Sequence, residues 1–237
     1  MSNDSYCLIL PAAGSGNRMN SEIPKPLLQL AGKSVLYWAI KVFASIPELK
    51  QIIIPTQASM FEQISSILDH VLSDAKRNDI KVDIIVGGKE RLFSIANALP
   101  YISKEVNLIM VHDAVRPLVS IKSILNCIET AKKTNACVLG LPLRETIKQT
   151  DGNGQVLSTP DRKSLWSIQT PQCFSKSVFV EAYKNALHHK YFGTDDSSVI
   201  EFAGFPVLVS EGNSENIKIT YPLDLKLAEI LMINRDN

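Results

Sequence analysis

The sequence predicts an α/β fold with a mainly parallel β-sheet and a protruding β-hairpin arm. Short apolar runs alternate with longer helical patterns, which is the rhythm of a parallel sheet covered by helices. That rhythm breaks between residues 143 and 170, where a turn-forming cluster separates two runs of strand character. With 237 residues, of which 45% are hydrophobic, the chain can bury one substantial core but not two full domains. We therefore expect a single domain over residues 1–237, with the arm at about 143–170.

Five apolar runs are predicted to form strands of the sheet. They lie at residues 6–10, 51–55, 82–86, 107–111 and 136–141. Between them, residues 35–44 and 60–72 have helical patterns, and apolar residues at 121, 124, 125 and 128 follow the spacing of one helix face. We expect these apolar faces to pack against the sheet.

The predicted arm is a long hairpin. Its strand-like segments ETIKQT and QVLST flank the turn formers Asp151, Gly152, Asn153 and Gly154. A hairpin with few core residues is marginally stable alone, so we expect the arm to pack against a second subunit. After the arm we expect helices at 176–187 and 195–203, strands at 207–210 and 217–220, and a final helix from residue 222.

The composition favours a small ligand over a macromolecular one. The 25 basic residues nearly balance the 24 acidic ones, so no overall field favours nucleic acid or an anionic membrane. No apolar run reaches the roughly 18 residues of a membrane span, and the N-terminus lacks the pattern of a signal peptide. The four cysteines lack a C-x-x-C pairing, which suits buried thiols in a reducing cytosol. We therefore expect a cytoplasmic protein that binds neither nucleic acid nor membrane.

The loop after the first predicted strand is the clearest candidate binding site. Small residues at 12–16 let a ligand approach the backbone and lay phosphates along exposed N–H groups. Arg18 and Lys25 add two cations, and the fixed φ of Pro24 and Pro26 restricts the segment that carries Lys25. The combination suits a polyphosphate.

Two common phosphate-binding patterns do not match this loop. A dinucleotide fingerprint needs a third glycine where Met19 stands, and a P-loop needs a glycine where Leu27 precedes the Gly-Lys-Ser triplet of residues 32–34. Gly14 and Gly16 alone would be equally consistent with an ordinary turn between a strand and a helix. The two cations are what favour a phosphate site.

Further motifs identify a family. Together with VHDAVRP, DRKSLW, TPQCF and NIKIT, the loop PAAGSGNRMNSEIPKPL resembles the bacterial and plastid 2-C-methyl-D-erythritol 4-phosphate cytidylyltransferases over nearly the whole chain. PAAGSG alone is shared with many sugar nucleotidyltransferases, whereas the ordered set is specific to this family and its sister, the ribitol-5-phosphate cytidylyltransferases. The resemblance implies a Rossmann-like nucleotidyltransferase fold that dimerises through the arm, with the arm reaching into the neighbouring active site.

The same resemblance implies transfer of CMP from CTP to 2-C-methyl-D-erythritol 4-phosphate, with release of pyrophosphate, in the non-mevalonate route to isoprenoids. VHDAVRP and DRKSLW favour this acceptor over ribitol 5-phosphate, which is the first alternative. The second alternative is a nucleotide-binding protein that keeps the fold without catalysis. Retention of the cationic positions argues against it.

The resemblance assigns roles to three groups of residues. The residues that stabilise charge during transfer are Arg18, Lys25 and Lys218. Those that bind CTP are Ala12, Ala13, Gly14, Gly16, Gly88 and Ser94. Those that bind the acceptor are Asp113, Arg116, Thr146, Arg162 and Thr194, with Thr146 and Arg162 acting across the dimer interface. Mg²⁺ or another divalent cation is expected to bridge the phosphates, with Asp113 and Glu215 as candidate ligands.

Each assignment has a structural alternative. These are an Asp113–Arg116 ion pair, a solvated Lys218, ordinary surface positions for Thr146 and Arg162, a plain turn at Gly88, and a helix N-cap at Thr194. His112 is predicted to be a hydrogen-bonded structural residue, because transfer to an already ionised phosphate needs no general base.

Overall fold

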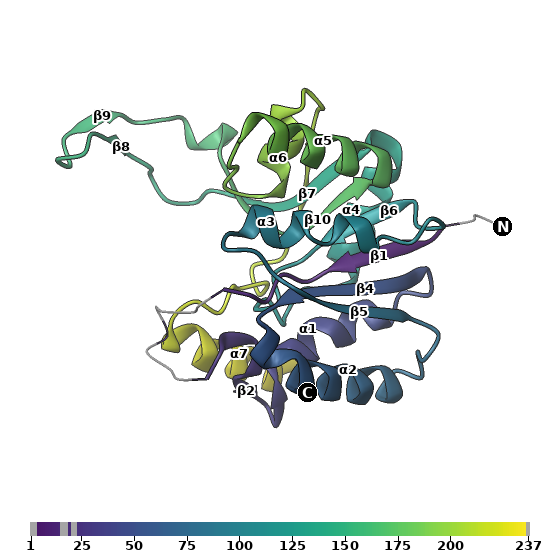
Figure 1. Ribbon diagram of the computed structural model, residues 1–237. Coiled ribbons are helices and arrows are strands. Elements are labelled where there is room, and N and C mark those ends of the chain that lie inside the picture. Colours follow the sequence, from purple (N-terminus) through teal and green to yellow (C-terminus); the bar gives the residue numbers. More distant parts are fainter. Residues whose placement is uncertain (1–3, 15–18, 20–22, 236–237) are drawn as a thin grey trace.

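The fold is built on one mainly parallel sheet (Figure 1). The computed structural model describes residues 4–14, 19 and 23–235, and within them seven strands form this sheet in the order β11-β7-β10-β6-β1-β4-β5. The strands are β1 (Tyr6–Ile9), β4 (Leu49–Thr56), β5 (Lys81–Val86), β6 (Leu108–Val111), β7 (Ala136–Pro142), β10 (Trp166–Ser175) and β11 (Leu208–Glu211). All neighbours pair in parallel except β10, which runs antiparallel to both β6 and β7. The predicted α/β class is confirmed.

Helices cover both faces of the sheet (Figure 1). One apolar cluster joins the sheet to α1 (Val35–Ala44), α2 (Phe61–Asp74) and α4 (Ile121–Thr134). A second joins the opposite face to α3 (Arg91–Ala96), α5 (Lys176–His189) and α6 (Asp196–Phe202). Successive residues of a strand point to opposite faces, so Leu8 packs in the first cluster while Cys7 and Ile9 pack in the second.

A third, smaller cluster fixes the position of two segments beside the sheet. Helix α7 (Pro222–Arg235) packs against the short hairpin of β2 (Gln29–Leu30) and β3 (Lys33–Ser34). Leu28 and Ile219 belong to the same cluster. The 3₁₀ turn η2 (Lys25–Leu27) and the segment around Lys218 are therefore anchored by one shared apolar contact region. Elsewhere the chain forms the 3₁₀ turns η3 (Ala58–Met60) and η4 (Leu99–Tyr101).

In the second half of the chain, one predicted strand does not form and one strand was missed. Residues 217–220 form no strand, because they lie beside the loop after β6, where Ile219 N donates to Val115 O at 2.9 Å. Strand β10 was not predicted at all. Its buried residues include Gln169, Thr170 and Gln172, so it shows no apolar run, although hydrogen bonds satisfy these polar groups inside the fold.

The arm projects away from the body of the molecule (Figure 1). Its antiparallel pair is short, formed by β8 (Gln149–Thr150) and β9 (Val156–Ser158), and the 3₁₀ turn η5 (Arg162–Ser164) follows. Residues 166–168, at the end of the expected arm of about 143–170, pair with β7 in the main sheet. The arm carries exposed apolar side chains, with Val156 52% and Leu157 61% accessible.

Two further sequence expectations concern membranes and thiols. In the described part of the chain, no helix is long and apolar enough to cross a bilayer. The four cysteines are buried and unpaired, as expected of structural thiols.

Candidate functional site

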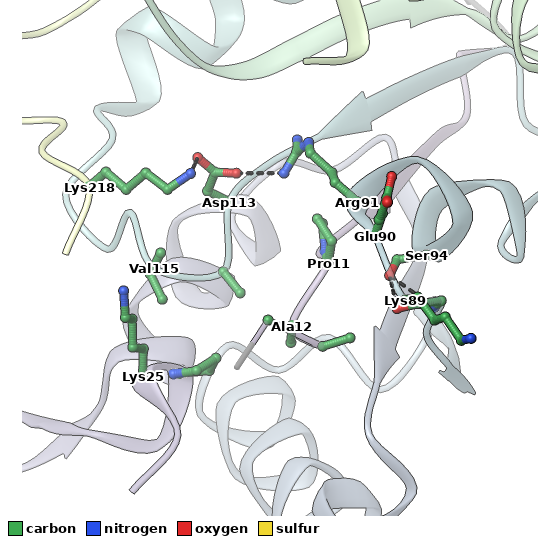
Figure 2. A pocket seen from close by; sticks show the side chains of 15 residues that line it. Pro11, Ala12, Lys25, Lys89, Glu90, Arg91, Ser94, Asp113, Val115 and Lys218 are labelled. Atoms are coloured by element: carbon green, nitrogen blue, oxygen red, sulfur yellow. Dashed lines mark hydrogen bonds and ion pairs between the residues drawn. The ribbon is translucent and has the colours of Figure 1, made fainter. Parts of the chain in front are cut away.

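A cavity of about 480 Å³ lies at the carboxyl edge of the sheet (Figure 2). It is lined by residues 11–14 after β1, residues 88–91 and Ser94 after β5, residues 113–115 after β6, and Lys25, Pro26 and Lys218. Strands β4 and β5 extend the sheet on one side of β1, whereas β6 lies on the other. The cavity therefore opens at the point where the strand order reverses, which is where open α/β sheets bind ligands.

A second cavity, of about 490 Å³, adjoins the first. Arg91, Asp113 and Lys218 line both. The remaining lining residues of the second cavity are Arg116, residues 168–170 and Gln172 of β10, and Thr194, Asp195, Ser197, Ser198 and Glu201 around the start of α6. The three shared residues thus form the boundary between two adjoining binding spaces.

The loop after β1 is held close to the turn after β5. Ala12 N donates to Pro55 O at 2.8 Å, and Gln57 Nε2 donates to Ala13 O at 3.2 Å. A Cβ atom on Gly87 would lie 2.6 Å from the Cβ of Ala13. Only glycine permits this approach, which brings two stretches of backbone into one wall of the first cavity.

Ser94 shapes the same turn. Its Oγ accepts from Gly88 N at 3.0 Å and lies 3.3 Å from Gly88 O, to which it donates. A Cβ on Gly88 would collide with the Cβ of Phe93. The predicted CTP-binding residues Gly88 and Ser94 are therefore bonded to each other, and the serine fixes the backbone that lines the cavity.

Asp113 is the centre of the polar network. Its Oδ1 accepts from Arg91 Nη1 at 2.8 Å, and its Oδ2 lies 3.1 Å from Arg116 Nε and 3.0 Å from Lys218 Nζ. Figure 2 shows Lys218 and Arg91 approaching this carboxylate from opposite sides. Burial favours the neutral acid, but the three cations hold the pKa of Asp113 well below its usual range. The carboxylate is ionised at every physiological pH.

His112 has the structural role that the sequence predicts. It is fully buried, with Nε2 2.9 Å from Arg116 O and Nδ1 3.0 Å from Thr170 Oγ1. A carbonyl oxygen only accepts, so Nε2 carries the proton and Nδ1 accepts from the threonine, which in turn accepts from Asp113 N at 3.1 Å. Burial lowers the pKa of His112 to about 4. The neutral ring fixes the backbone on both sides of Asp113.

Arg91 is a site residue that the sequence reasoning missed. Its Nη1 contacts Asp113, and its Nη2 lies 2.6 Å from Asp196 Oδ2. Burial disfavours its charged form, but Asp196 and Asp113 raise the pKa of Arg91 above its ordinary value. Arg91 is the first residue of α3, where the helix dipole disfavours a cation that has no acidic partner.

Lys25 and Lys218 line the same cavity, although they lie 193 residues apart in the sequence. The two segments that carry them are in contact. Lys25 Nζ donates to Thr220 O at 3.2 Å. The Lys218 side chain remains 46% exposed. Both side chains therefore lie where they can contact an anionic ligand in that cavity.

Other predicted acceptor residues are placed differently. Arg116 lines the second cavity, and its Nη1 also donates to Asn216 O at 2.7 Å. Thr194 lines that cavity too, but the N-cap of α6 is Asp195, whose side chain accepts from Ser198 N at 3.0 Å. The alternative that Thr194 caps this helix is therefore wrong.

The remaining predicted residues do not meet in the cavities of one chain. Thr146 and Arg162 lie exposed on the arm, where Arg162 Nη1 donates to Arg144 O at 2.8 Å, and neither lines a cavity described above. Glu215 also lines neither cavity. Gly16 and Arg18 lie outside the described residues.

The donor set limits how a metal could be held. Within residues 4–14, 19 and 23–235, no three His, Cys, Asp or Glu side chains gather as a metal site. Asp113 is ionised, but three cations already contact its two oxygens. A divalent cation at this site would therefore depend chiefly on the phosphates of a ligand.

Comparisons with known proteins agree on one family. The family model described as 2-C-methyl-D-erythritol 4-phosphate cytidylyltransferase matches residues 6–234. A protein of that name from Caldanaerobacter subterraneus subsp. tengcongensis is 40% identical over 224 residues, covering 94% of this chain and 97% of that protein. Another from Clostridioides difficile is 37% identical over 227 residues, covering 96% of this chain and 93% of that protein.

Solved structures give the same result. The 4-diphosphocytidyl-2C-methyl-D-erythritol synthase of Anaerococcus prevotii aligns with a TM-score of 0.84 at 27% identity, covering 98% of this chain and 100% of that one. The 2-C-methyl-D-erythritol 4-phosphate cytidylyltransferase of Francisella tularensis aligns with a TM-score of 0.77 at 31% identity, covering 96% and 99%.

Proposed function

This chain belongs to the 2-C-methyl-D-erythritol 4-phosphate cytidylyltransferase family, and from that membership we propose how its two adjoining cavities carry out the reaction. The enzyme transfers CMP from CTP to 2-C-methyl-D-erythritol 4-phosphate, giving 4-diphosphocytidyl-2-C-methyl-D-erythritol and pyrophosphate in the non-mevalonate pathway. The observation that carries the proposed division of the site is the boundary of Arg91, Asp113 and Lys218 between the two cavities. CTP occupies the first cavity and the acceptor occupies the second.

The first cavity suits a cytidine nucleotide. Backbone groups of residues 12–14 lie opposite the turn that Gly88 and Ser94 form. Such groups can read the edge of a pyrimidine, and the close approach of the two backbone segments leaves less room for a purine. The cationic side of the cavity, with Lys25, takes the triphosphate.

The transfer step brings two anions together. A phosphate oxygen of the acceptor attacks the α-phosphorus of CTP, one new P–O bond forms, and the α–β bridging bond breaks with its electron pair leaving on pyrophosphate. Lys25 and Lys218 neutralise the charge that is concentrated there. Asp113 holds Lys218 in place, and neutral His112 takes no proton.

A divalent cation fits this division of roles. Mg²⁺ would be held by the phosphates, with Asp113 as its protein ligand, and when bound it neutralises part of the triphosphate charge. Glu215 lines neither cavity, so its carboxylate is not expected to contact this ion.

The assembly proposed is a homodimer in the cytoplasm. Exposed Val156 and Leu157 on the arm favour contact with a second chain, because an isolated hairpin is marginally stable. Thr146 and Arg162 of each arm would then reach the acceptor cavity of the partner. The four unpaired thiols are consistent with a reducing compartment.

A paired acceptor assay tests the function. Pyrophosphate release is measured with purified enzyme, CTP and Mg²⁺, with either 2-C-methyl-D-erythritol 4-phosphate or ribitol 5-phosphate. We expect kcat/KM for the methylerythritol acceptor to be higher by about tenfold or more, because the acceptors differ in hydroxyl and methyl positions that the second cavity must distinguish. Faster turnover of ribitol 5-phosphate would overturn the acceptor assignment, and no turnover of either would overturn catalysis.

A further inference from the structure

Arg91 forms two ion pairs at the boundary between the two cavities. Its guanidinium bonds Asp113, which follows β6, through Nη1 at 2.8 Å, and Asp196, the first residue of α6, through Nη2 at 2.6 Å. Arg91 lies at this boundary because it lines both cavities. The inference below rests on the proposed function, since it concerns the same transfer step.

The charge of Arg91 is committed to these two carboxylates. The Asp113 and Asp196 side chains are 8% and 1% exposed, and a buried carboxylate without a cationic partner is strongly destabilising. Lys218, by contrast, pairs with one carboxylate and stays 46% exposed. Arg91 is therefore a fixed counterion, whereas Lys218 can turn its charge toward a ligand.

Fixing Asp113 also gives Lys218 a defined partner. Arg91 holds Oδ1, which leaves Oδ2 directed at Arg116 and Lys218. Without the Oδ1 contact, the carboxylate can rotate about χ2, a torsion with a broad energy well. Lys218 would then lose a defined partner at the boundary where acceptor and α-phosphate meet.

The far end of the arginine is anchored in the wall of the acceptor cavity. Tyr183 is fully buried, and its hydroxyl donates to Asp196 Oδ1 at 2.5 Å. The adjacent Asp195 accepts from Gln172 Nε2 at 2.7 Å and from Ser197 Oγ at 2.8 Å, and all three of these residues line the second cavity. Helix α6 and β10 are thereby tied through Arg91 to the loop that carries Asp113.

We infer that Arg91 is a positioning residue for cytidylyl transfer. Anchored by Asp196 and Tyr183, it sets the orientation of Asp113 and, through Asp113, the position of Lys218 between the two substrates. The role requires a planar fork that reaches two carboxylates at once, which lysine cannot supply.

The test compares Arg91→Met and Arg91→Lys with the wild-type enzyme, using steady-state kinetics for each substrate. We expect kcat to fall by about 100-fold in Arg91→Met, because small misplacements of reacting groups have effects of that size. KM for CTP should stay within about twofold, since the loop of residues 12–14 and the Gly88 turn are untouched, while KM for the acceptor rises. Arg91→Lys should recover only a small part of the loss.

Asp196→Asn gives an independent measurement of the same contact. It also keeps the test interpretable if Arg91→Met folds poorly. Arg91→Met leaves two buried carboxylates without their shared cation, so the double variant Arg91→Met/Asp196→Asn, which removes one of those charges, is measured beside it. We expect Asp196→Asn alone to lower kcat by roughly tenfold, and to add almost nothing once Arg91 is replaced, because both residues act through one contact.

Arg77 offers a matched control. Its side chain is 15% exposed and donates to the carbonyl oxygens of Ala44, Ile46 and Leu49, but it lines neither cavity. Arg77→Met should lower the thermal midpoint while leaving kcat and both KM values unchanged per folded enzyme.

Two outcomes would overturn the inference. One is an Arg91→Met enzyme that loses thermal stability as Arg77→Met does but keeps its wild-type kcat and acceptor KM. The other is full activity in Arg91→Lys, since a single positive charge would then be enough to position Asp113 without the planar fork of arginine. A wild-type enzyme inactive with both acceptors would instead refute the proposed function, so the two failures are distinguishable.

Discussion

Charges at single residues decide the chemistry of this site. Asp113 is buried, and burial alone would favour its neutral form. Arg91, Arg116 and Lys218 surround it closely enough to keep it ionised. His112 shows the opposite case, since burial outweighs the nearby negative charge of Asp113 and keeps the ring neutral. One carboxylate and one imidazole, neighbours in sequence, are thus held in fixed protonation states by different surroundings.

The lowered pKa of His112 predicts a loss of stability in acid. A histidine has a pKa of about 6.5 when unfolded, and burial lowers that of His112 to about 4 in the folded protein. The unfolded state takes up the proton more readily than the folded state. The contribution of neutral His112 to the free energy of unfolding is therefore fully present above pH 6.5 and is lost as the pH falls toward 4. The linked free energy is about 3 kcal/mol across that window.

Urea unfolding between pH 7.5 and 4.5 measures this effect. The comparison variant is His112→Asn, which does not titrate and keeps hydrogen-bonding capacity. The wild-type free energy of unfolding should fall more steeply below pH 6.5 than that of the variant. Parallel pH profiles for the two proteins would show that His112 is not the group responsible.

At the scale of elements, the turn from β5 to α3 determines the shape of the nucleotide cavity. The turn places Gly87 against Ala13, and Ser94 bonds the backbone of Gly88 on both its N–H and its carbonyl. The same turn places Arg91 at the start of α3. One short connection therefore shapes the proposed cytidine pocket and positions the arginine that bridges the two cavities.

Gly88→Ala should weaken CTP binding. The added Cβ would meet the Cβ of Phe93, and it would lie 2.8 Å from the backbone carbon of that residue and 2.9 Å from Ser94 N, so the backbone has to move. Overpacking of this kind costs about 1–3 kcal/mol, which corresponds to a rise in KM for CTP of roughly fivefold to 150-fold. Steady-state kinetics with saturating acceptor measures it.

Gly152→Ala is the control for that substitution. Gly152 lies in the arm turn, and an added Cβ would meet nothing within 4 Å. Its KM for CTP should match the wild-type value. An unchanged KM in Gly88→Ala as well would mean that the turn does not contact the nucleotide.

For the whole molecule, the main question is whether the arm serves its own chain or a second one. In one chain, Thr146 and Arg162 lie outside both cavities, on a segment that projects from the body (Figure 1). A partner's arm could instead complete the acceptor cavity. Complementation between inactive variants separates these two arrangements.

We expect mixed dimers of Lys25→Ala and Arg162→Ala to regain activity. Each variant alone should lose turnover by orders of magnitude, because each removes a cation from the reacting phosphates. In a mixed dimer with exchanged arms, one site has both Lys25 and Arg162 intact, so random reassociation should restore about one quarter of the wild-type sites. Pyrophosphate release after subunit exchange measures the recovery.

The control pair is Lys25→Ala with Lys218→Ala. Both residues belong to the body of the chain and line the same cavity, so no mixed dimer contains an intact site. Activity should remain low in this mixture. If the Lys25→Ala and Arg162→Ala mixture also stays inactive despite proven exchange, the arm does not complete the neighbouring site.

Much of the architecture could be predicted because it depends on local apolar patterns. The early strands, the helices that cover them and the loop after β1 all have periodicities that burial imposes on sequence. Strand β10 could not be found in this way. Its buried residues include polar ones whose hydrogen-bond partners, such as Asp195 and Ser197, come from another part of the chain.

The sequence by itself determined the fold class, the family and the glycine-rich loop, because these depend on the order of residue types along the chain. Only the tertiary structure decided which charges meet. Arg91, Asp113, Asp196 and Lys218 come from four separate segments, and their contacts arise where strand ends, a helix start and a C-terminal loop converge. Electrostatic coupling between two charges weakens as the distance between them in space increases. Such proximity has no local signature in the sequence. The boundary between the two cavities is therefore a property of the folded chain.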